Sequence, residues 1–274
     1  MKICVISGKK NQSKMKILTD QLGAKHCFEK TPKKIVSLVP SQTELLYDLG
    51  LKNSIIGITK FCVHPNHFLK EKTIIGGTKN VHYDKIKNLN PEVIIANKEE
   101  NTKEIITELS KICPVWTTDI VDINDNQKMI EDFGNLFEKQ TESLNLISEI
   151  NSLLDQISIQ NESKKIKKVA YFIWANPYMV AASGTFINDM LRLDNLENVF
   201  ANQSRYPEIQ LSDLSQIKDL DLIYLSSEPF PFKEKHALEI QKFAPNAKII
   251  FVDGELYSWH GSRITKYLQS IIKS

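Results

Sequence analysis

The sequence predicts an α/β protein with two similar lobes, each built on a parallel-type sheet, joined by one long backbone helix. Short apolar runs rich in β-branched residues alternate with helical segments, which is typical of parallel sheets covered on both faces. The pattern that opens at Lys33 recurs at Lys167, and a long stretch with helical periodicity separates the two copies. We therefore expect an N-terminal extension with a small hairpin over residues 1–32, an N-terminal lobe over 33–123, a connecting helix over 124–162 and a C-terminal lobe over 163–274.

The extension is expected to end in a hairpin, because Thr19–Lys30 alternates apolar and polar residues around a turn at Gly23. Its early apolar run, Ile3–Ile6, is too short for the core of a secretory signal. With no export signal visible, the chain as written is expected to be cytoplasmic. Met1 and Met15 both remain candidates for the true start.

Five short apolar runs in the N-terminal lobe predict the strands of the first sheet. Helical or turn segments separate them, among them Thr43–Gly50 and Asp84–Leu89. The runs are Ile35–Val39, Ile55–Ile58, Ile74–Ile75, Val93–Ala96 and Val115–Trp116.

From Asn124 to about Ile159, apolar residues fall at spacings of three and four, which predicts one long helix. About 34 residues at ~1.5 Å each would span roughly 50 Å, enough for a stiff strut between two lobes. Such a strut predicts little closure when a ligand arrives.

The C-terminal lobe repeats the alternation, with strands expected at Val169–Trp174, Met179–Ala182, Leu222–Leu225 and Ile249–Val252. Helices are expected near Phe186–Arg192, Lys233–Phe243 and Arg263–Ile272. Two similar α/β lobes in one chain leave a crevice between them, and ligands bind in such crevices.

The composition limits the classes of function. The 274 residues are 42% hydrophobic, and 35 basic against 33 acidic residues give a net charge of +2, which provides no electrostatic reason to expect nucleic acid. No apolar segment approaches the ~20 residues of a membrane span. The four cysteines lie far apart, which fits a reducing compartment better than a disulfide framework. We expect a monomer, and no phosphate loop, nucleophile elbow or H-E-x-x-H motif demands an enzyme.

Aromatic residues are abundant in the loops that follow the expected strands. A flat metal complex needs broad, rigid apolar walls, and aromatic side chains supply them. Individual aromatics can equally be part of the core. The candidates for ligand contact are Trp174, Tyr178, Tyr206 and Trp259, with Tyr83 in the first lobe.

The loop before the last expected helix places Trp259, His260 and Arg263 close together. The guanidinium of Arg263 could hold a carboxylate or phosphate edge of a ligand, or pair with Glu255 or Asp253 as part of the scaffold. His260 could coordinate a ligand's metal, or simply be solvated.

His64 lies in the segment Phe61–His67, where one thiol and two imidazoles form the only metal-like spacing in the chain. A structural zinc site needs four ligands, so the segment predicts no metal site of the protein's own. His64 is instead a candidate for the mouth of the crevice. The polar segments Lys98–Asn101 and Ser226–Pro229 follow matching strands and could bind ligand groups or cap helices.

Five segments carry a resemblance to the helical-backbone metal receptor family, the substrate-binding proteins of ABC importers for cobalamin, iron siderophores and heme. They are Ile35–Leu46, Gly76–Val81, Leu89–Ile95, Gly184–Leu191 and Asn198–Phe200. The chain looks most similar to the cobalamin-type branch. The resemblance implies a receptor with no cofactor of its own that holds cobalamin or another metal complex between its lobes and delivers it to an ABC permease. Family members are usually periplasmic or surface-anchored.

The resemblance also implies docking to the permease through one acidic residue on each lobe. Asp84 matches the first position. Ser212 stands at the second position, with Asp213 next to it, and helix capping is the alternative for both sites. Three other functions remain open: an iron-siderophore or heme binding protein, a cytoplasmic sensor or carrier, and an enzyme of the tetrapyrrole-chelatase kind that uses His64 or His260.

Overall fold

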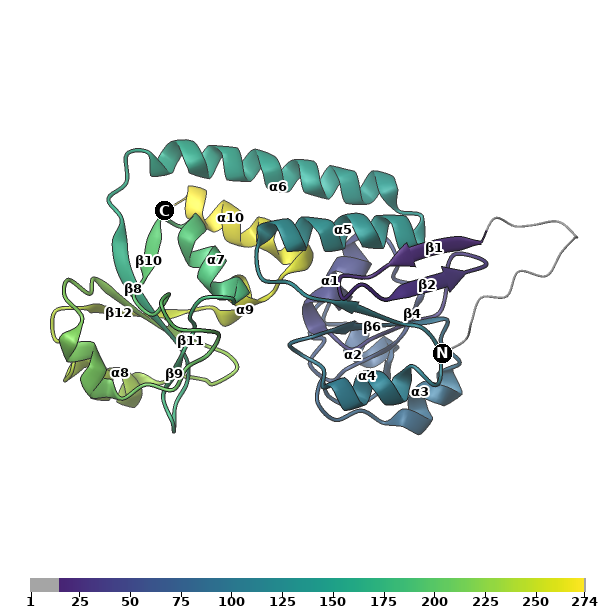
Figure 1. The fold of residues 1–274 in the computed structure, drawn as a ribbon, viewed down its shortest axis with the longest axis horizontal. Helices are drawn as coiled ribbons and strands as arrows, with labels where there is room; N and C mark the ends of the chain where they lie inside the picture. The colour runs from purple at the N-terminus through teal and green to yellow at the C-terminus, as the bar shows by residue number, and fades with distance from the viewer. Residues whose placement is uncertain (1–14, 274) are drawn as a thin grey trace, which may run out of the picture. The chain divides into compact units, whose positions relative to one another are not determined.

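The computed structural model describes residues 15–273, which form two compact units with mostly parallel sheets (Figure 1). Of the described residues, unit 1 takes those up to Asp119 and Gln127–Ile147, and unit 2 takes Ile120–Asn126 and those from Ser148 on. Cys4 and the first part of the expected extension lie outside the described residues. The predicted α/β class with parallel sheets is confirmed.

The sheet of unit 1 is parallel throughout and has the order β5-β4-β3-β6-β7. The first strand, β3, lies in the middle, and later strands are added first on one side and then on the other. The direction of winding therefore changes between β3 and β6. The strands are β3 (Ile35–Ser37), β4 (Ile55–Ile58), β5 (Thr73–Ile74), β6 (Val93–Asn97) and β7 (Val115–Thr118).

Helices cover this sheet because each has an apolar side to bury. Ile86 of α3 and Leu109 of α4 pack with Val36 and Ile94 of the central strands. α1 begins with Pro40, whose fixed φ suits the first turn of a helix. The helices of unit 1 around the sheet are α1 (Pro40–Asp48), α2 (Phe68–Glu71), α3 (Tyr83–Leu89) and α4 (Lys103–Leu109).

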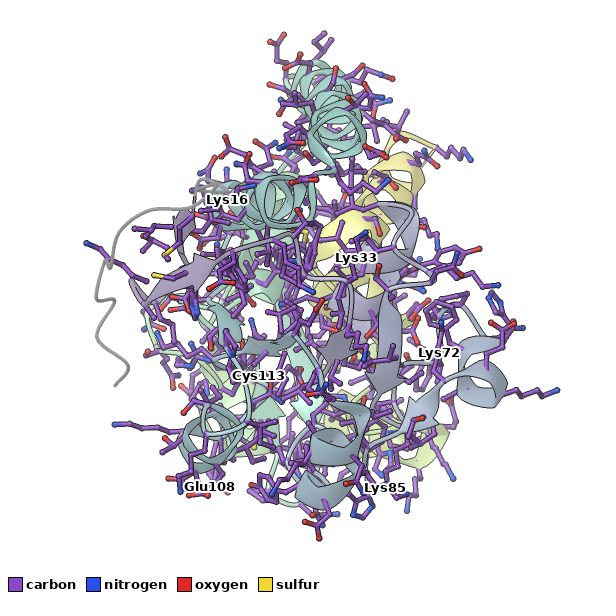
Figure 2. All side chains as sticks on the ribbon, turned by 90° about the vertical axis from the view of Figure 1, so that its right-hand side faces the viewer. Lys16, Lys33, Lys72, Lys85, Glu108 and Cys113 are labelled. Carbon is purple, nitrogen blue, oxygen red and sulfur yellow. The ribbon has the colours of Figure 1, made fainter. Side chains whose placement is uncertain are left out.

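An antiparallel hairpin of β1 (Lys16–Thr19) and β2 (Lys25–Phe28) precedes the sheet. Its turn contains Gly23 at a φ of 81°. The buried carboxylate of Asp20 accepts hydrogen bonds from the backbone N–H of Ala24 at 2.9 Å and of Thr117 at 3.3 Å, so the turn is tied to β7. At the start of β1, the ammonium group of Lys16, which is labelled in Figure 2, donates to the carbonyl of Asn135.

The structure corrects the span of the connecting helix expected over 124–162. The segment forms two helices. α5 (Ile123–Phe137) begins in unit 2 and ends in unit 1, and α6 (Gln140–Asn161) begins in unit 1 and ends in unit 2. Glu138 between them has a φ of 55°, a left-handed conformation that ends helices. Residues 138–143 are all polar, but the apolar residues on either side, Phe137 and Leu144, are seven positions apart and so stay in helical phase. For that reason the sequence pattern did not reveal the turn.

The sheet of unit 2 has the order β10-β8-β11-β12, with all neighbours parallel and β9 added antiparallel to β8. The direction of winding changes between β8 and β11. The strands are β8 (Lys167–Trp174), β9 (Met179–Val180), β10 (Leu196–Asn198), β11 (Leu222–Ser226) and β12 (Lys248–Val252).

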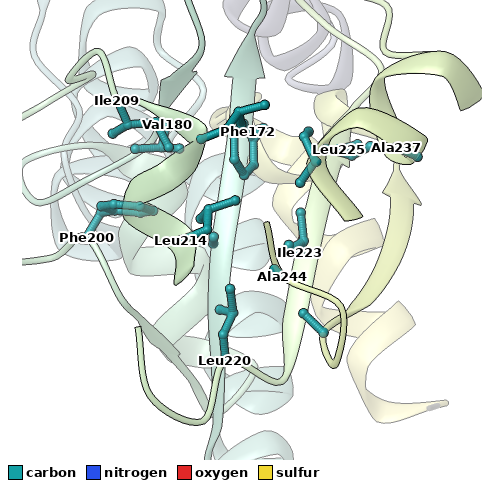
Figure 3. Packing of buried hydrophobic residues seen from close by; sticks show 14 of the residues in the cluster. Phe172, Val180, Phe200, Ile209, Leu214, Leu220, Ile223, Leu225, Ala237 and Ala244 are labelled. Carbon is teal, nitrogen blue, oxygen red and sulfur yellow. The ribbon is translucent and has the colours of Figure 1, made fainter. Parts of the chain in front are cut away.

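Alternate residues of the central strands of unit 2 serve two different layers. Phe172 and Leu225 pack with Leu214 and Ala237 on one face, which is the cluster shown in Figure 3. On the other face, the ring of Tyr171 lies 5.2 Å from that of Tyr257. The helical segments of unit 2 are α7 (Phe186–Leu193), η1 (Leu211–Gln216), α8 (Glu234–Gln241), α9 (Gly254–Ser258), η2 (Gly261–Arg263) and α10 (Ile264–Ile272).

Within residues 15–273, no helix combines the length and the apolar character that crossing a bilayer takes.

Candidate functional site

In both units the strand order changes direction at one point, and in open α/β sheets ligands bind beyond the carboxyl ends of the strands at such a point. In unit 1 the point lies between β3 and β6. In unit 2 it lies between β8 and β11. The loops that follow these strands are therefore the candidate functional surface of each unit.

In unit 1, two buried asparagines shape the loop that follows β6. The side-chain oxygen of Asn97 accepts the backbone N–H of Glu99 at 2.9 Å, and that of Asn101 accepts the backbone N–H of Asn97 at 2.9 Å. The amide nitrogen of Asn101 donates to the carbonyl of Thr78 at 2.8 Å. The loop after β6 is thereby fixed to the loop after β5.

A pocket of about 530 Å³ lies in unit 1 beside these loops. Gly76 in its wall has a φ of 115°, and a Cβ added there would lie 2.4 Å from the carbonyl oxygen of Asn80, so only glycine fits. Phe61, whose ring is 49% exposed, supplies the aromatic part of the lining. The lining residues are Lys60, Phe61, Ile74, Gly76, Gly77, Thr78, Lys79, Asn80 and His82.

The residues predicted from sequence in unit 1 lie around the same strand ends. Tyr83 is the first residue of α3 and is 39% exposed. Asp84 follows it, exposed in the first turn of that helix. His64 is half-buried in the loop between β4 and α2. The cap position of α3 is His82, so Asp84 does not take the capping role that was its alternative.

In unit 2, Trp174 is the last residue of β8 and lies at the change of direction. Its side chain is 39% exposed, and its ring contacts that of Phe230 edge to face, with the centroids 5.5 Å apart. Phe230 in turn packs on Phe232 and His236, at 5.0 and 5.2 Å. Trp174 therefore exposes part of its indole to solvent while its contact with Phe230 holds the ring in place.

Glu228, in the loop after β11, is the polar residue at the same point. Its Oε1 accepts hydrogen bonds from the hydroxyl of Ser258 at 2.9 Å and from Nε1 of Trp259 at 2.8 Å. Burial raises the pKa of Glu228, and the hydrogen bonds from Ser258 and Trp259 oppose that effect. The loop after β11 is thus joined to the loop after β12.

Trp259 and Arg263 are held inside this network. Trp259 is 8% exposed, and the guanidinium carbon of Arg263 lies 4.8 Å from the centre of its ring. Arg263 is itself buried and forms an ion pair with Glu255 at 2.9 Å, which is the scaffold role considered as its alternative. Because it is buried, the indole of Trp259 supports the loops from inside and offers a ligand little exposed surface.

His260 is buried and lies edge to face against Phe186, with the ring centroids 6.0 Å apart. Burial lowers the pKa of His260 to about 4, so the imidazole is neutral near pH 7. From the sequence, His260 could have been a solvated loop residue. In the structure it is instead packed in the interior.

The remaining predicted residues of unit 2 lie on other parts of it. The hydroxyl of Tyr178 donates to Glu239 of α8 at 2.7 Å. Tyr206, between β10 and η1, is half-buried under the guanidinium of Arg205. Asp213 is exposed in η1 and accepts the backbone N–H of Gln210 at 3.0 Å.

The structure therefore joins Trp259 and Arg263 in one network and places Trp174 next to Phe230. Sequence reasoning did not single out Lys60, Phe61 or Lys79 of the pocket in unit 1. The available signal was the Gly76–Gly77 pair directly after a strand, because paired glycines mark a tight turn. Among residues 15–273, no three His, Cys, Asp or Glu side chains come together as a metal site.

Comparison with known proteins places this fold in a family. Residues 35–256 match the family model described as periplasmic binding protein. A Bacillus subtilis protein named as an uncharacterized ABC transporter substrate-binding lipoprotein is 28% identical over 201 residues, which cover 70% of this chain and 62% of that protein. The chain thus matches less than two thirds of that relative's length.

Two further relatives are named for what they bind. A vitamin B12-binding protein of Vibrio vulnificus is 24% identical, over 66% of this chain and 67% of the relative. The petrobactin-binding protein of Bacillus subtilis is 28% identical, over 64% of this chain and 56% of the relative. The named ligands are complexes that these relatives hold, so a metal complex enters this family as a ligand and not as a cofactor of the protein.

A solved structure shows the same fold. The periplasmic heme-binding protein of a Roseiflexus species superposes with a TM-score of 0.76 at 16% identity, covering 88% of this chain and 97% of that one. The relatives are named as binding proteins, and their names as a lipoprotein and as a periplasmic protein give no support to a cytoplasmic location. Because the family model matches residues 35–256, most of the chain, the protein belongs to the periplasmic binding protein family.

Proposed function

We propose that the protein is the substrate-binding component of an ABC importer and that its ligand is a metal complex of the cobalamin, siderophore or heme kind. The family match over residues 35–256 carries this proposal. The names of the relatives supply the ligand classes, since they include vitamin B12, petrobactin and heme. The lipoprotein and periplasmic relatives favour a place of action outside the cytoplasmic membrane.

Each unit contributes an aromatic surface at its strand ends to ligand binding. In unit 2 this surface is the exposed face of Trp174, which Phe230 holds in place. In unit 1 it is Phe61 in the pocket, with Tyr83 and His64 nearby in sequence. Trp259, His260 and Arg263 support the ligand surface from behind, because they are buried. Tyr178 and Tyr206 remain candidate contacts at its edge.

Asp84 and Asp213 are the proposed contacts with the permease. Both carboxylates are exposed, and each lies in the first turn of its helical segment, α3 or η1. Acidic groups in that position interact favourably with the nearby backbone N–H groups, and their exposure leaves them accessible to a basic partner.

Equilibrium dialysis of the purified chain against cyanocobalamin, hemin and a ferric siderophore tests the proposal, with Trp174→Ala as the site variant. Removing a half-exposed indole from the site is expected to weaken binding about tenfold or more, since aromatic side chains dominate contact energies. Ile166→Ala is the matched control, because Ile166 is 57% exposed and directly precedes β8, at the amino end of the strand that Trp174 ends. Binding that is equally weakened in both variants would count against a role for Trp174.

A further inference from the structure

The charge of the pocket in unit 1 indicates what kind of metal complex would fit. Among its nine lining residues are Lys60, Lys79 and His82, and within that described lining there is no carboxylate. Lys60 and Lys79 are both exposed. The lining is therefore cationic, although the net charge of the whole chain is only +2.

The two lysines of the pocket differ from others on unit 1 in their partners. Lys98 pairs with Asp119, and Lys111 pairs with Glu108 at 2.7 Å. Among residues 15–273, by contrast, no carboxylate pairs with Lys60 or Lys79. The ammonium of Lys60 lies 5.0 Å from the centre of the Phe61 ring, a cation–π contact that holds it at the pocket without neutralising it.

The walls around these charges are preformed. The backbone N–H of Gly77 donates to the carbonyl of Asn80 at 2.8 Å, which closes the turn that carries Lys79. A Cβ on Gly77 would lie 3.1 Å from the Phe61 ring, so the ring packs directly on this backbone. Asn101 fixes the carbonyl of Thr78 from the loop after β6. A preformed surface avoids the cost of ordering its groups when the ligand binds.

One more cation borders the pocket. The ammonium of Lys85, which Figure 2 labels on the surface of α3, reaches the carbonyl of Ile74 at 3.5 Å, and Ile74 belongs to the lining. Cations gathered around a hollow raise the local concentration of anions and orient them as they arrive. A neutral ligand could accept hydrogen bonds from these ammonium groups but would gain no long-range electrostatic attraction from them.

We infer that the ligand of this protein is an anionic metal chelate, one whose outer carboxylate or catecholate oxygens pair with Lys60 and Lys79 while its planar part packs on Phe61. This inference rests on the proposed function and narrows it to complexes with negative charge on their periphery. It favours such chelates over the neutral ones that the relatives' names also allow.

Equilibrium dialysis with chelates of matched size and different charge tests the inference. The probes are a ferric tris-catecholate complex, which is multiply anionic, a ferric trihydroxamate complex, which is neutral, and cyanocobalamin. We expect the anionic chelate to bind at least tenfold more tightly than the neutral one at low salt, with the difference shrinking as salt rises.

Lysine variants then locate the effect. Lys60→Gln and Lys79→Gln should each weaken binding of the anionic chelate up to about fivefold, the range for exposed charge pairs, and leave the neutral chelate unaffected. Lys87→Gln is the matched control, because Lys87 is exposed on α3 but does not line the pocket.

The outcomes separate the two proposals. Tighter binding of the neutral chelate, or unchanged affinity of the anionic chelate in both lysine variants, would overturn the anionic inference and leave the proposed receptor function standing. Absence of binding by all three probes would overturn both.

Discussion

Glu228 shows how a single residue organises the loops at the carboxyl end of the second sheet. It receives hydrogen bonds from Ser258 and Trp259, both of which follow a different strand. The loop after β12 also approaches so closely that a Cβ on Gly254 would lie 2.4 Å from the hydroxyl of Ser226. The side chain of Glu228 therefore sets the distance between two loops of the candidate surface.

Replacing Glu228 by alanine would remove the carboxylate that accepts from Nε1 of Trp259. The hydroxyl of Ser258 would keep the carbonyl of Gly254 at 2.9 Å as an acceptor. We expect Glu228→Ala to lower the free energy of unfolding by about 1–3 kcal/mol, the usual cost of unpaired buried donors. Glu228→Gln keeps an acceptor oxygen and should cost less. Urea unfolding followed by circular dichroism measures both, and equal losses in the two variants would show that the acceptor is not what matters.

His260 gives the protein a defined acid sensitivity. Burial lowers the pKa of His260 to about 4 from its ordinary value of 6.5. Between these values the unfolded chain binds a proton that the folded chain does not, so the free energy of unfolding falls as the pH is lowered from about 6.5 towards 4. The full contribution is about 3 kcal/mol, from about 1.4 kcal/mol for each pKa unit.

His260→Gln should therefore reduce the loss of stability between pH 6.5 and pH 4. His82→Gln is the control, because it removes a histidine that is exposed where His260 is buried. Thermal unfolding at a series of pH values compares the variants with the parent chain. A slope that is as steep in His260→Gln as in the parent would contradict the assignment.

At the scale of elements, the hairpin of α5 and α6 depends on one close contact. A Cβ on Gly134 would lie 2.1 Å from the hydroxyl oxygen and 2.7 Å from the Cβ of Ser143. The backbone N–H of Lys139 also donates to the carbonyl of Gly134 at 2.8 Å, closing the turn. The two helices can approach this closely because residue 134 has no side chain.

Gly134→Ala is accordingly expected to lower the free energy of unfolding by about 1–3 kcal/mol, although alanine is the better helix former. Adding Ser143→Gly removes both clashing atoms and should recover part of the loss. A double-mutant cycle of urea unfolding measures the coupling. If the two effects were simply additive, the close approach of α5 and α6 would not be their cause.

The order of elements was largely predictable from sequence, because buried parallel strands such as Val93–Asn97 read as continuous apolar runs. The turn at Glu138 was not, since residue 138 itself is not a glycine, proline or asparagine, and the apolar residues Phe137 and Leu144 on either side of the polar run stay in helical phase. Tertiary contact between Gly134 and Ser143 overrides the local preference there.

The candidate site was predictable only in part. Trp174 could be proposed because it ends a strand in a polar context. The burial of Trp259 and His260 could not, because it depends on partners far away in the sequence, Glu228 and Phe186. The cationic pocket depends likewise on two loops, one with Lys60 and one with Lys79, whose proximity sequence spacing does not show.

At the scale of the whole molecule, the chain consists of two units with the same type of sheet, and the helices α5 and α6 each begin in one unit and end in the other. Each sheet changes its direction of winding once, which gives each unit one set of loops suited to ligands. That a rigid α6 limits closure on ligand binding stays a prediction.

The permease contacts are tested separately from ligand binding. Asp84→Ala and Asp213→Ala should leave the affinity for a chelate unchanged, because both carboxylates are exposed and neither lines the pocket in unit 1. Uptake of the labelled chelate by cells that carry each variant should nevertheless fall. Normal uptake with both variants combined would remove these residues from the docking surface.

Isothermal titration calorimetry of the purified chain with an anionic ferric chelate, a neutral ferric chelate, cyanocobalamin and hemin tests the receptor function most directly. The account predicts that at least one of these complexes binds with a single saturable site and a dissociation constant of about 1 μM or lower, corresponding to roughly 8 kcal/mol. If none of the four saturates the chain at concentrations approaching about 1 mM, where binding would be worth only about 4 kcal/mol, the proposal that this protein carries metal complexes is contradicted.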